Sequence, residues 1–294
     1  MDKDEKEHAD DLLEALTGTE EEPAGDSAEA ASTLTHVDVL FDDAEILHDV
    51  SVAFPAHECT VIMGPSGSGK STLLKAAAGL IVPDSGTVEI LDVDPDRTSD
   101  SELEALRKRN GFVFQDGALW QNMTLYQNLA LPVQYHYPAI DAKTLRARID
   151  RLVRELSISA SLALRPSQVS AGERKLISFA RAVVNEPELV FMDEPTTSVD
   201  TERIELLIRK LRELKEHRQT IIAVTHNARI ASQLADHVVV LKDGRILRFG
   251  SLKDVSRSGD PEVERILTDV LSETATYDGD ILELLDPDTN SSLR

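Results

Sequence analysis

The chain has 294 residues, 41% of them hydrophobic, which allows a sizeable core in one large or two small domains. Its net charge of −22 lies mostly at the ends: residues 1–32 carry −10, residues 256–294 carry −7, and the rest carries an ordinary −5. Because acidic ends repel nucleic acid and anionic lipid, these values argue against a nucleic-acid partner.

The sequence carries no signal for a membrane span or for export. No apolar run approaches the roughly 18 residues needed to cross a bilayer, and the acidic N-terminus is unlike a secretory signal. The lone cysteine, Cys59, has no partner for an internal disulfide, which fits a core position in a reducing compartment. We therefore expect a cytoplasmic protein that reaches a membrane only through a partner.

An acidic segment and then short strands open the chain. Residues 1–32 combine acids with small residues, which predicts a disordered tail with one short helix at Asp11–Leu16. Strands and turns then lead through Leu34–Phe41 and Val50–Phe54 to Cys59–Met63, an apolar run that predicts a buried strand.

The stretch Gly64–Thr72 matches the phosphate-binding loop pattern of a glycine, four residues and then Gly-Lys-Ser. A strand precedes it and a helix-forming run up to Gly79 follows it, which is the context that this motif needs. Backbone N–H groups of such a loop curl around a polyphosphate, helped by the positive end of the helix. We expect Lys70 to reach the β- and γ-phosphates and the Ser71 hydroxyl to hold Mg²⁺. The binding residues predicted here are Gly64, Pro65, Ser66, Gly67, Ser68, Gly69, Lys70, Ser71 and Thr72.

Beyond this loop, strands at Thr87–Leu91 and Gly111–Phe114 flank a short helix at Glu102–Arg109. Helical spacing at Met123–Leu131 and Lys143–Leu156 then indicates a helical insertion between two parts of a sheet. We expect a helical subdomain over about 117–185. The remaining chain alternates helices with continuous apolar strands, as in a parallel sheet covered on both faces. Its expected strands are Leu189–Met192, Ile221–Val224, Val238–Leu241 and Arg245–Leu247, and its expected helices are Glu202–Lys215, Ala228–Leu234 and Pro261–Leu271.

Two carboxylates, Asp193 and Glu194, end the buried strand that starts at Leu189. Ligands of open α/β sheets bind at the carboxyl ends of strands. Asp193 suits a contact to Mg²⁺, which prefers oxygen ligands, and Glu194 can polarise the attacking water as general base. The alternative is a pair of surface acids at a strand end, which is less favoured beside a phosphate loop.

Other positions fit a nucleotide site but also admit structural roles. Ser170 and Glu173 have the spacing of a helix capping box, and the same helix end could bind an anion. His226 and Gln115 follow strands and could contact a γ-phosphate and Mg²⁺ or water, respectively. Phe41 could stack on adenine or serve as an ordinary core or edge aromatic.

The order of these motifs resembles that of the ATP-binding cassette ATPases, the nucleotide-binding subunits of ABC transporters. The resemblance extends from about Leu34 to Gly250 and includes a D-loop at Thr197–Asp200. It implies an α/β P-loop NTPase fold over residues 33–255, with a mixed β-sheet core, an antiparallel β subdomain and an inserted α-helical subdomain. It also implies ATP and Mg²⁺ as ligands, with Gln115 in the Q-loop, His226 as switch histidine and Phe41 against adenine.

The signature segment, Val169–Glu173, departs from the family's usual Leu-Ser-Gly-Gly-Gln. Ser170 and Gly172 are kept, so the anion-binding end is expected to persist. Ala171 adds a methyl group, and Glu173 adds negative charge near phosphate. Members of the family dimerise head to tail, so this segment would complete the ATP site of a second, identical cassette. We expect the departure to affect turnover and closure rather than ATP binding.

The resemblance further implies a separate membrane permease, docked beside the Q-loop over Asp116–Val133 at the inner face of the inner membrane. The sequence from Gln115 to Pro132 is similar to that of ATPases of Mce/Mla-type phospholipid transporters. This resemblance implies an Mce-type lipid-binding protein as a further partner. It also implies that the acidic extension 256–294 contacts a partner subunit. The alternatives are another importer, a cell-division-type complex or a soluble regulatory cassette. A genome-maintenance cassette is disfavoured because no sustained heptads separate the phosphate loop from the signature.

Overall fold

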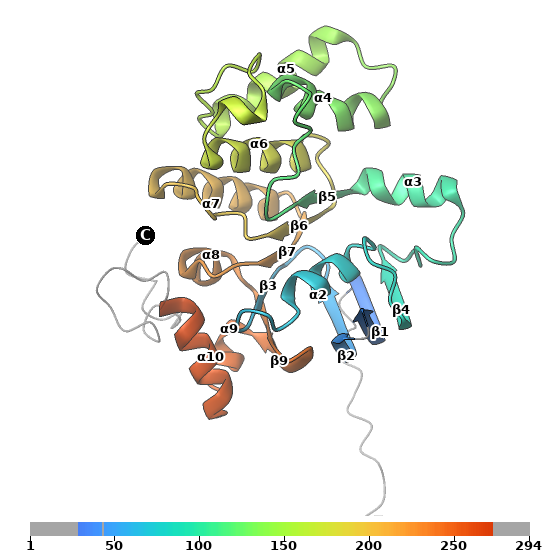
Figure 1. Cartoon of the computed structure of the whole chain (residues 1–294), viewed down its shortest axis with the longest axis vertical. Coiled ribbons are helices and arrows are strands. Elements are labelled where there is room, and N and C mark those ends of the chain that lie inside the picture. The colour runs from blue at the N-terminus through green and yellow to red at the C-terminus, as the bar shows by residue number, and fades with distance from the viewer. Residues whose placement is uncertain (1–28, 43, 273–294) are drawn as a thin grey trace, which may run out of the picture.

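Two β-sheets and two groups of helices make up the computed structural model, which describes residues 29–42 and 44–272 (Figure 1). The helix expected at Asp11–Leu16 and most of the expected acidic tail lie outside the described residues. The first strand begins at Ala30, so the boundary expected after residue 32 falls inside a strand and is corrected here.

The first sheet is antiparallel, in the order β2-β1-β4, with β1 at Ala30–Phe41, β2 at Ala44–Pro55 and β4 at Ser85–Ile90. The second sheet has the order β5-β6-β7-β3-β8-β9, and all of its neighbours are parallel except β8 and β9. Its strands are β3 Cys59–Met63, β5 Asn110–Val113, β6 Leu189–Asp193, β7 Thr220–Val224, β8 His237–Lys242 and β9 Arg245–Ser251. The mixed core sheet and antiparallel subdomain expected from the sequence are confirmed.

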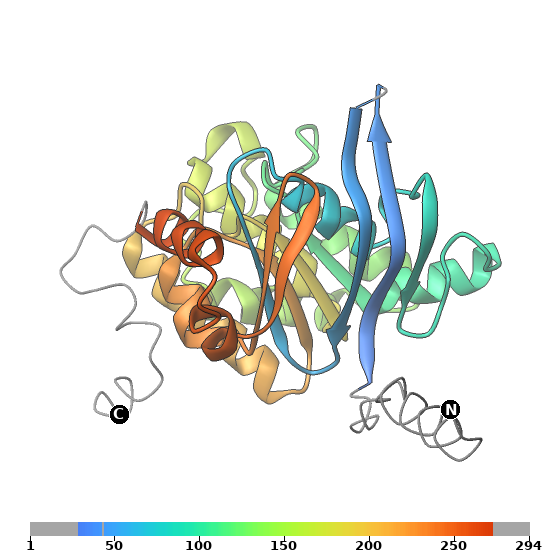
Figure 2. The same ribbon diagram turned by 90° about the horizontal axis from the view of Figure 1, so that it is seen from below.

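The helices cover both faces of the second sheet. They are α2 Lys70–Ala77, α3 Asp100–Arg109, α4 Leu125–His136, α5 Ala142–Glu155, the 3₁₀ turn η1 Pro166–Gln168, α6 Ala171–Val183, α7 Thr201–Glu216, α8 Ala228–Leu234, α9 Leu252–Ser256 and α10 Pro261–Ser272. Helix α2 packs between the two sheets. Helices α4, α5 and α6 lie together at the top of Figure 1, away from α2 and the antiparallel sheet. Seen from below, β1 and β2 form a long hairpin beside the six-stranded sheet (Figure 2).

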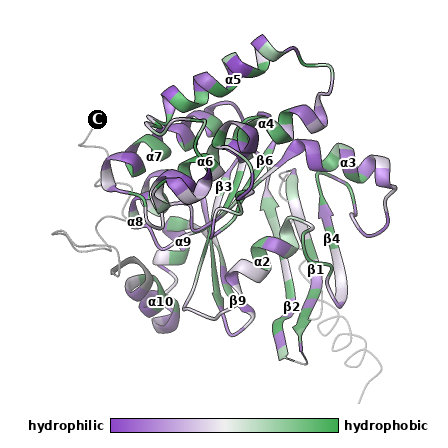
Figure 3. Cartoon of the chain, turned by 45° about the horizontal axis from the view of Figure 1, so that its top comes forward, coloured by the Kyte–Doolittle hydropathy of each residue, from purple (hydrophilic) through white to green (hydrophobic). Residues whose placement is uncertain are grey.

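Alternation along the buried strands divides the interior into two cores. In β3, Val61 and Met63 face the core shared with α4 to α8, while Ile62 faces the core shared with α2 and the first sheet. This period of two follows from the pleat, and a strand buried on both faces is apolar throughout. The strands are accordingly mostly hydrophobic, whereas outer helices such as α5 and α7 alternate hydrophilic and hydrophobic residues (Figure 3).

Helix α10 belongs to the same interior as the parallel sheet. Its residues Val263, Ile266 and Leu267 are buried in the core that contains Val238 and Val240 of β8. The helix expected at Pro261–Leu271 is therefore observed, one residue longer, as a packed element. Among the described residues, no helix combines the length and apolar character that crossing a membrane requires.

Several boundaries differ from expectation for identifiable reasons. Helix α4 continues past Pro132 to His136, although proline breaks most helices. A tertiary contact stabilises it at the proline, where Asn185 donates to the carbonyl oxygen of Pro132, and the buried Asn128 side chain anchors the start of the helix by donating to the carbonyl oxygens of Trp120 and Thr124. Strand β2 begins at Ala44, six residues before the start expected at Val50. The polar residues in this part of β2 break the alternation of apolar and polar residues, and pairing with β1 defines the strand instead.

Candidate functional site

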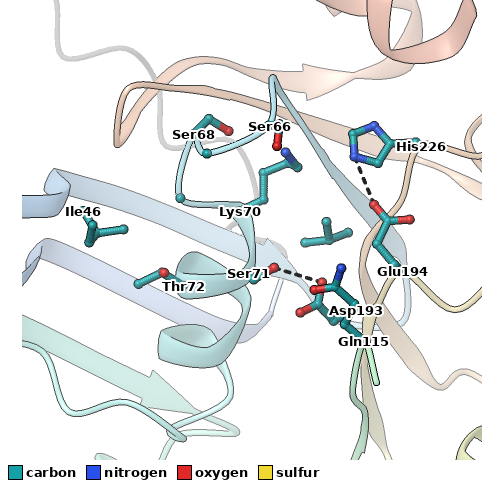
Figure 4. Close-up of a pocket in the computed structure, with 13 residues that line it drawn as sticks. Ile46, Ser66, Ser68, Lys70, Ser71, Thr72, Gln115, Asp193, Glu194 and His226 are labelled. Atoms are coloured by element: carbon teal, nitrogen blue, oxygen red, sulfur yellow. Dashed lines mark hydrogen bonds and ion pairs between the residues drawn. The ribbon is translucent and has the colours of Figure 1, made fainter. Parts of the chain in front are cut away.

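A cavity of about 350 Å³ lies where four parallel strands of the second sheet end (Figure 4). This volume falls within the usual range for small-molecule sites. The phosphate loop follows β3, Gln115 follows β5, Glu194 follows β6 and His226 follows β7, so the topology gathers segments that are far apart in sequence. The lining residues are Ile46, Ser66, Gly67, Ser68, Gly69, Lys70, Ser71, Thr72, Gln115, Asp193, Glu194, Val224 and His226.

The phosphate loop is closed by a glycine that no other residue can replace without strain. Gly69 precedes α2 with a φ of 96°, and a Cβ atom here would lie 2.9 Å from the carbonyl oxygen of Ile46. No side chain caps this end of α2, so no capping residue accepts a hydrogen bond from the first backbone N–H groups of the helix. Such an N-terminus binds phosphate readily.

The ammonium of Lys70 folds back over the loop. Its Nζ donates to the carbonyl oxygens of Gly64 at 2.8 Å and Pro65 at 2.7 Å, and the side chain is buried. Gly64 and Pro65 therefore hold the lysine rather than line the cavity. The charge is fixed at the mouth of the loop, where phosphate oxygens can replace these two carbonyl groups.

Ser71 and Asp193 meet across the cavity. The Ser71 hydroxyl donates to Oδ1 of Asp193 at 3.0 Å, and Gln115 lines the same side. All three side chains offer oxygen atoms, which is the donor chemistry that Mg²⁺ prefers. Among the described residues, no cluster of three His, Cys, Asp or Glu side chains suits a metal by itself. A magnesium ion here would thus need further oxygens from phosphates and water.

Glu194 combines a strained backbone with a buried carboxylate. Its φ is 49°, its N–H donates to the carbonyl oxygen of Val224, and its Oε1 lies 3.1 Å from Nε2 of His226. Burial raises the pKa of Glu194 to about 7, and the neighbouring charge of Asp193 adds to this, while Lys70 and Lys175 oppose it. A carboxylate with this pKa can accept a proton near neutral pH.

The signature segment lies away from this cavity, at the N-terminus of α6. Ser170 caps the helix: its Oγ accepts the N–H of Glu173 at 3.2 Å, and the Glu173 carboxylate accepts from Ser170 in return. Ala171 is exposed and Gly172 is buried. A Cβ on Gly172 would lie 2.7 Å from the carbonyl oxygen of Ser198, so the D-loop packs directly on this glycine.

Phe41 also lies outside the cavity lining. It ends β1 at the tip of the hairpin and is 53% exposed, while Ile46 of β2 lines the cavity. Ile46 and Val224 were not identified from the sequence, because nothing in the pattern distinguishes them from other apolar strand residues. Lys175 was also missed, because its burial in α6 is visible only in the structure and lysine is rarely buried.

The fold and these contacts define a phosphate-loop nucleotide-binding protein. Its carboxylate pair, Asp193 and Glu194, lies at the end of β6, two strands away from the β3 strand that leads into the loop. A family model described as "ABC transporter" matches residues 47–197, slightly more than half of the chain. The chain belongs to this family, and it is an ATP-binding cassette ATPase.

Individual relatives agree with this assignment. The chain is 33% identical, over 81% of its length, to the sulfate/thiosulfate import ATP-binding protein CysA of Vibrio vulnificus, of which it covers 68%. It is 32% identical, over 76%, to the intermembrane phospholipid transport system ATP-binding protein MlaF of Escherichia coli, of which it covers 82%. The corresponding values for the probable ribonucleotide transport ATP-binding protein mkl of Mycobacterium leprae are 32%, 77% and 65%.

Solved cassettes share the fold. The dimeric ATP-binding cassette MJ0796, in a post-hydrolysis state with ADP and Pi, matches with a TM-score of 0.70 and 30% identity. The match covers 75% of this chain and 98% of that chain. The predicted ABC cassette fold is thereby confirmed.

Proposed function

We propose that this chain binds and hydrolyses ATP and so drives a transporter whose membrane permease is a separate protein. The observation that carries the proposal is the meeting of the phosphate loop with two carboxylates, through the 3.0 Å contact of Ser71 with Asp193 and the adjacent Glu194–His226 pair. These groups supply the parts that phosphoryl transfer requires, namely charge stabilisation and a positioned base.

Each side chain has a defined role in this proposal. The loop N–H groups and Lys70 bind the β- and γ-phosphates, while Ser71, Asp193 and Gln115 hold Mg²⁺. A magnesium ion held by these residues would neutralise negative charge that develops on the phosphates. Glu194 accepts a proton from the attacking water, and His226 orients the carboxylate of Glu194 and contacts the γ-phosphate.

A second copy of the chain completes the site. Ser170 and Gly172 bind the phosphate of the nucleotide held by the opposite protomer, with the N-terminus of α6 providing the anion-binding end. The dimeric cassette MJ0796 supports this arrangement. Ser170 and Gly172 lie outside the cavity of their own chain, as this arrangement requires.

A second groove, of about 460 Å³, suits the permease. It lies between α4, α6 and β5 and contains the exposed aromatic residues Trp120 and Tyr135, which are 56% and 63% accessible, respectively. Exposed aromatic side chains around a groove favour protein partners. The cassette would thereby sit on the cytoplasmic side of the inner membrane.

We propose phospholipid of the Mce/Mla type as the transported substrate, together with an Mce-type lipid-binding protein. The similarity to MlaF and the sequence from Gln115 to Pro132 support this assignment. A different importer is the second candidate, because sulfate and ribonucleotide transport proteins match at the same level of identity. Reconstitution with a permease and labelled phospholipid or sulfate separates the two.

Two substitutions test the ATPase itself. Lys70→Ala should abolish nucleotide binding and hydrolysis, because it removes the ammonium group that faces the phosphates. Glu194→Gln should abolish hydrolysis while ATP-dependent dimers accumulate, as measured by phosphate release and light scattering. Normal hydrolysis by either variant would refute the corresponding role.

A further inference from the structure

Helix α6 holds the backbone of residues 114–118 (here the 114–118 loop) through two cationic side chains. Nζ of Lys175 donates to the carbonyl oxygens of Phe114 at 3.2 Å and Gln115 at 2.5 Å. Arg181, near the other end of the helix, donates to the carbonyl oxygens of Gly117 at 3.1 Å and Ala118 at 2.7 Å. Four carbonyl groups of this loop are thus bound to one helix.

The environment of Lys175 is unusual for a lysine. The residue is 4% exposed, and within the described part of the chain its ammonium makes no ion pair. By contrast Lys210, which is 7% exposed, is paired with Glu155 at 2.8 Å and Glu213 at 2.9 Å. Burying a charge without a paired carboxylate is costly, so Lys175 is a poor device for stability alone.

The position of Lys175 links two functional segments. It lies five residues after the cap Ser170, or about 7.5 Å along the helix at 1.5 Å per residue. Burial lowers the pKa of the Lys175 ammonium, and the negative charges of Asp193, Glu194 and Asp116 oppose this shift. Lys175 therefore connects the helix that begins at the signature segment to the backbone of Gln115.

We propose that Lys175 is a positioning residue for ATP hydrolysis. It holds Gln115 at the cavity wall and sets the position of Gln115 relative to the N-terminal end of α6, where the signature segment lies. This inference rests on the proposed function. Lys175 is absent from the cavity lining, and it acts through the carbonyl groups of Phe114 and Gln115. Closure of the partner's ATP site at Ser170 and the placement of Gln115 in this chain's own site are thereby coupled.

The test replaces Lys175 with methionine in the full chain, which keeps the apolar stem and removes the donors. We expect kcat for MgATP to fall by on the order of tenfold to a hundredfold, as for small misplacements of catalytic groups. The KM for MgATP should stay within about twofold, since the phosphate loop is untouched. The dissociation constant of a fluorescent ATP analogue in EDTA should also stay within about twofold, for the same reason.

Two further variants separate positioning from packing. Lys175→Arg, which restores donors, should recover part of kcat, whereas Lys210→Met, a matched buried lysine away from the cavity, should lower the melting temperature and leave kcat unchanged. Wild-type kcat in Lys175→Met would overturn the inference, as would equal losses of kcat and analogue affinity. Failure of the wild-type chain to hydrolyse ATP would instead overturn the proposed function itself.

Discussion

The imidazole of His226 lies 3.1 Å from the carboxylate of Glu194, measured from Nε2 to Oε1, and so joins the segments that follow two neighbouring strands, β6 and β7. A backbone hydrogen bond from Glu194 to Val224 fixes the same junction at 2.9 Å. The carboxylate is thus held by contacts from two segments of the chain. This preorganisation makes Glu194 the residue whose chemistry is most open to measurement.

The pH dependence of hydrolysis should follow the ionisation of Glu194. Burial raises its pKa to about 7, and a general base works only when ionised. We expect kcat/KM to rise with pH up to about 7 and to level off above it, in assays from pH 5.5 to 9. Nucleotide binding by Glu194→Gln serves as control and should vary little over this range. A flat kcat/KM profile between pH 6 and 8 would contradict the assignment.

The same raised pKa predicts a stability effect with a definite sign. The pKa of Glu194 is 4.5 in the unfolded chain and about 7 in the folded protein. Between pH 4.5 and about pH 7 the folded protein therefore binds a proton at Glu194 that the unfolded chain has released, so the free energy of unfolding falls as pH rises through this range. Glu194→Gln removes this dependence and should stabilise the unliganded protein at pH 8 by on the order of 3 kcal/mol, because the two pKa values differ by about 2.5 and each pH unit is worth about 1.4 kcal/mol. Denaturant unfolding at pH 8 and pH 4.5 measures it, and a gain of equal size at both values would reject the explanation.

The two central positions of the signature segment should respond in opposite ways. Ala171 is exposed at the helix end, so Ala171→Gly should raise ATP turnover by allowing closer approach of the partner's nucleotide. A turnover that stays flat or falls would count against this role.

Gly172→Ala should lower both turnover and stability. Its new Cβ would lie 2.7 Å from the carbonyl oxygen of Ser198, and overpacking of this kind typically costs about 1–3 kcal/mol. Phosphate release and thermal unfolding of the purified variant are the measurements. A Gly172→Ala protein with the wild-type melting temperature would show that the D-loop can shift freely.

The adenine contact predicted for Phe41 remains open to a direct test. Phe41→Ala should weaken ATP binding by the equivalent of about 1–3 kcal/mol if the ring stacks on the base. Stability should change little because the side chain is 53% exposed. Phe249→Ala, at a 37% exposed aromatic on β9, is the matched control. Equal ATP affinities for the two variants would remove Phe41 from the site.

The phosphate loop and the carboxylate pair could be predicted from the sequence because each consists of consecutive residues. The loop Gly64–Thr72 carries its own glycines and lysine, and Asp193 and Glu194 directly follow an apolar run. The parallel strands then bring their ends to one edge of the sheet. Gln115 and His226 were found by this rule, and both line the cavity with the loop.

Features that depend on tertiary contact escaped prediction. The helical spacing seen in the sequence ended at Leu131, but Asn185 donates to the carbonyl oxygen of Pro132 and α4 continues to His136. Ile46 lines the cavity only because the hairpin brings β2 next to the phosphate loop. Lys175 resembles any helical lysine until the carbonyl groups of the 114–118 loop are seen to face it.

The packing of α10 bears on how far the cassette extends. Val263, Ile266 and Leu267 are buried together with β8, and Glu262 pairs with Lys242 of that strand. The segment after residue 255, which by charge alone is an acidic appendage, thus begins as part of the hydrophobic interior. A protein truncated at residue 255 would expose an apolar patch to water and should be recovered mainly as aggregate.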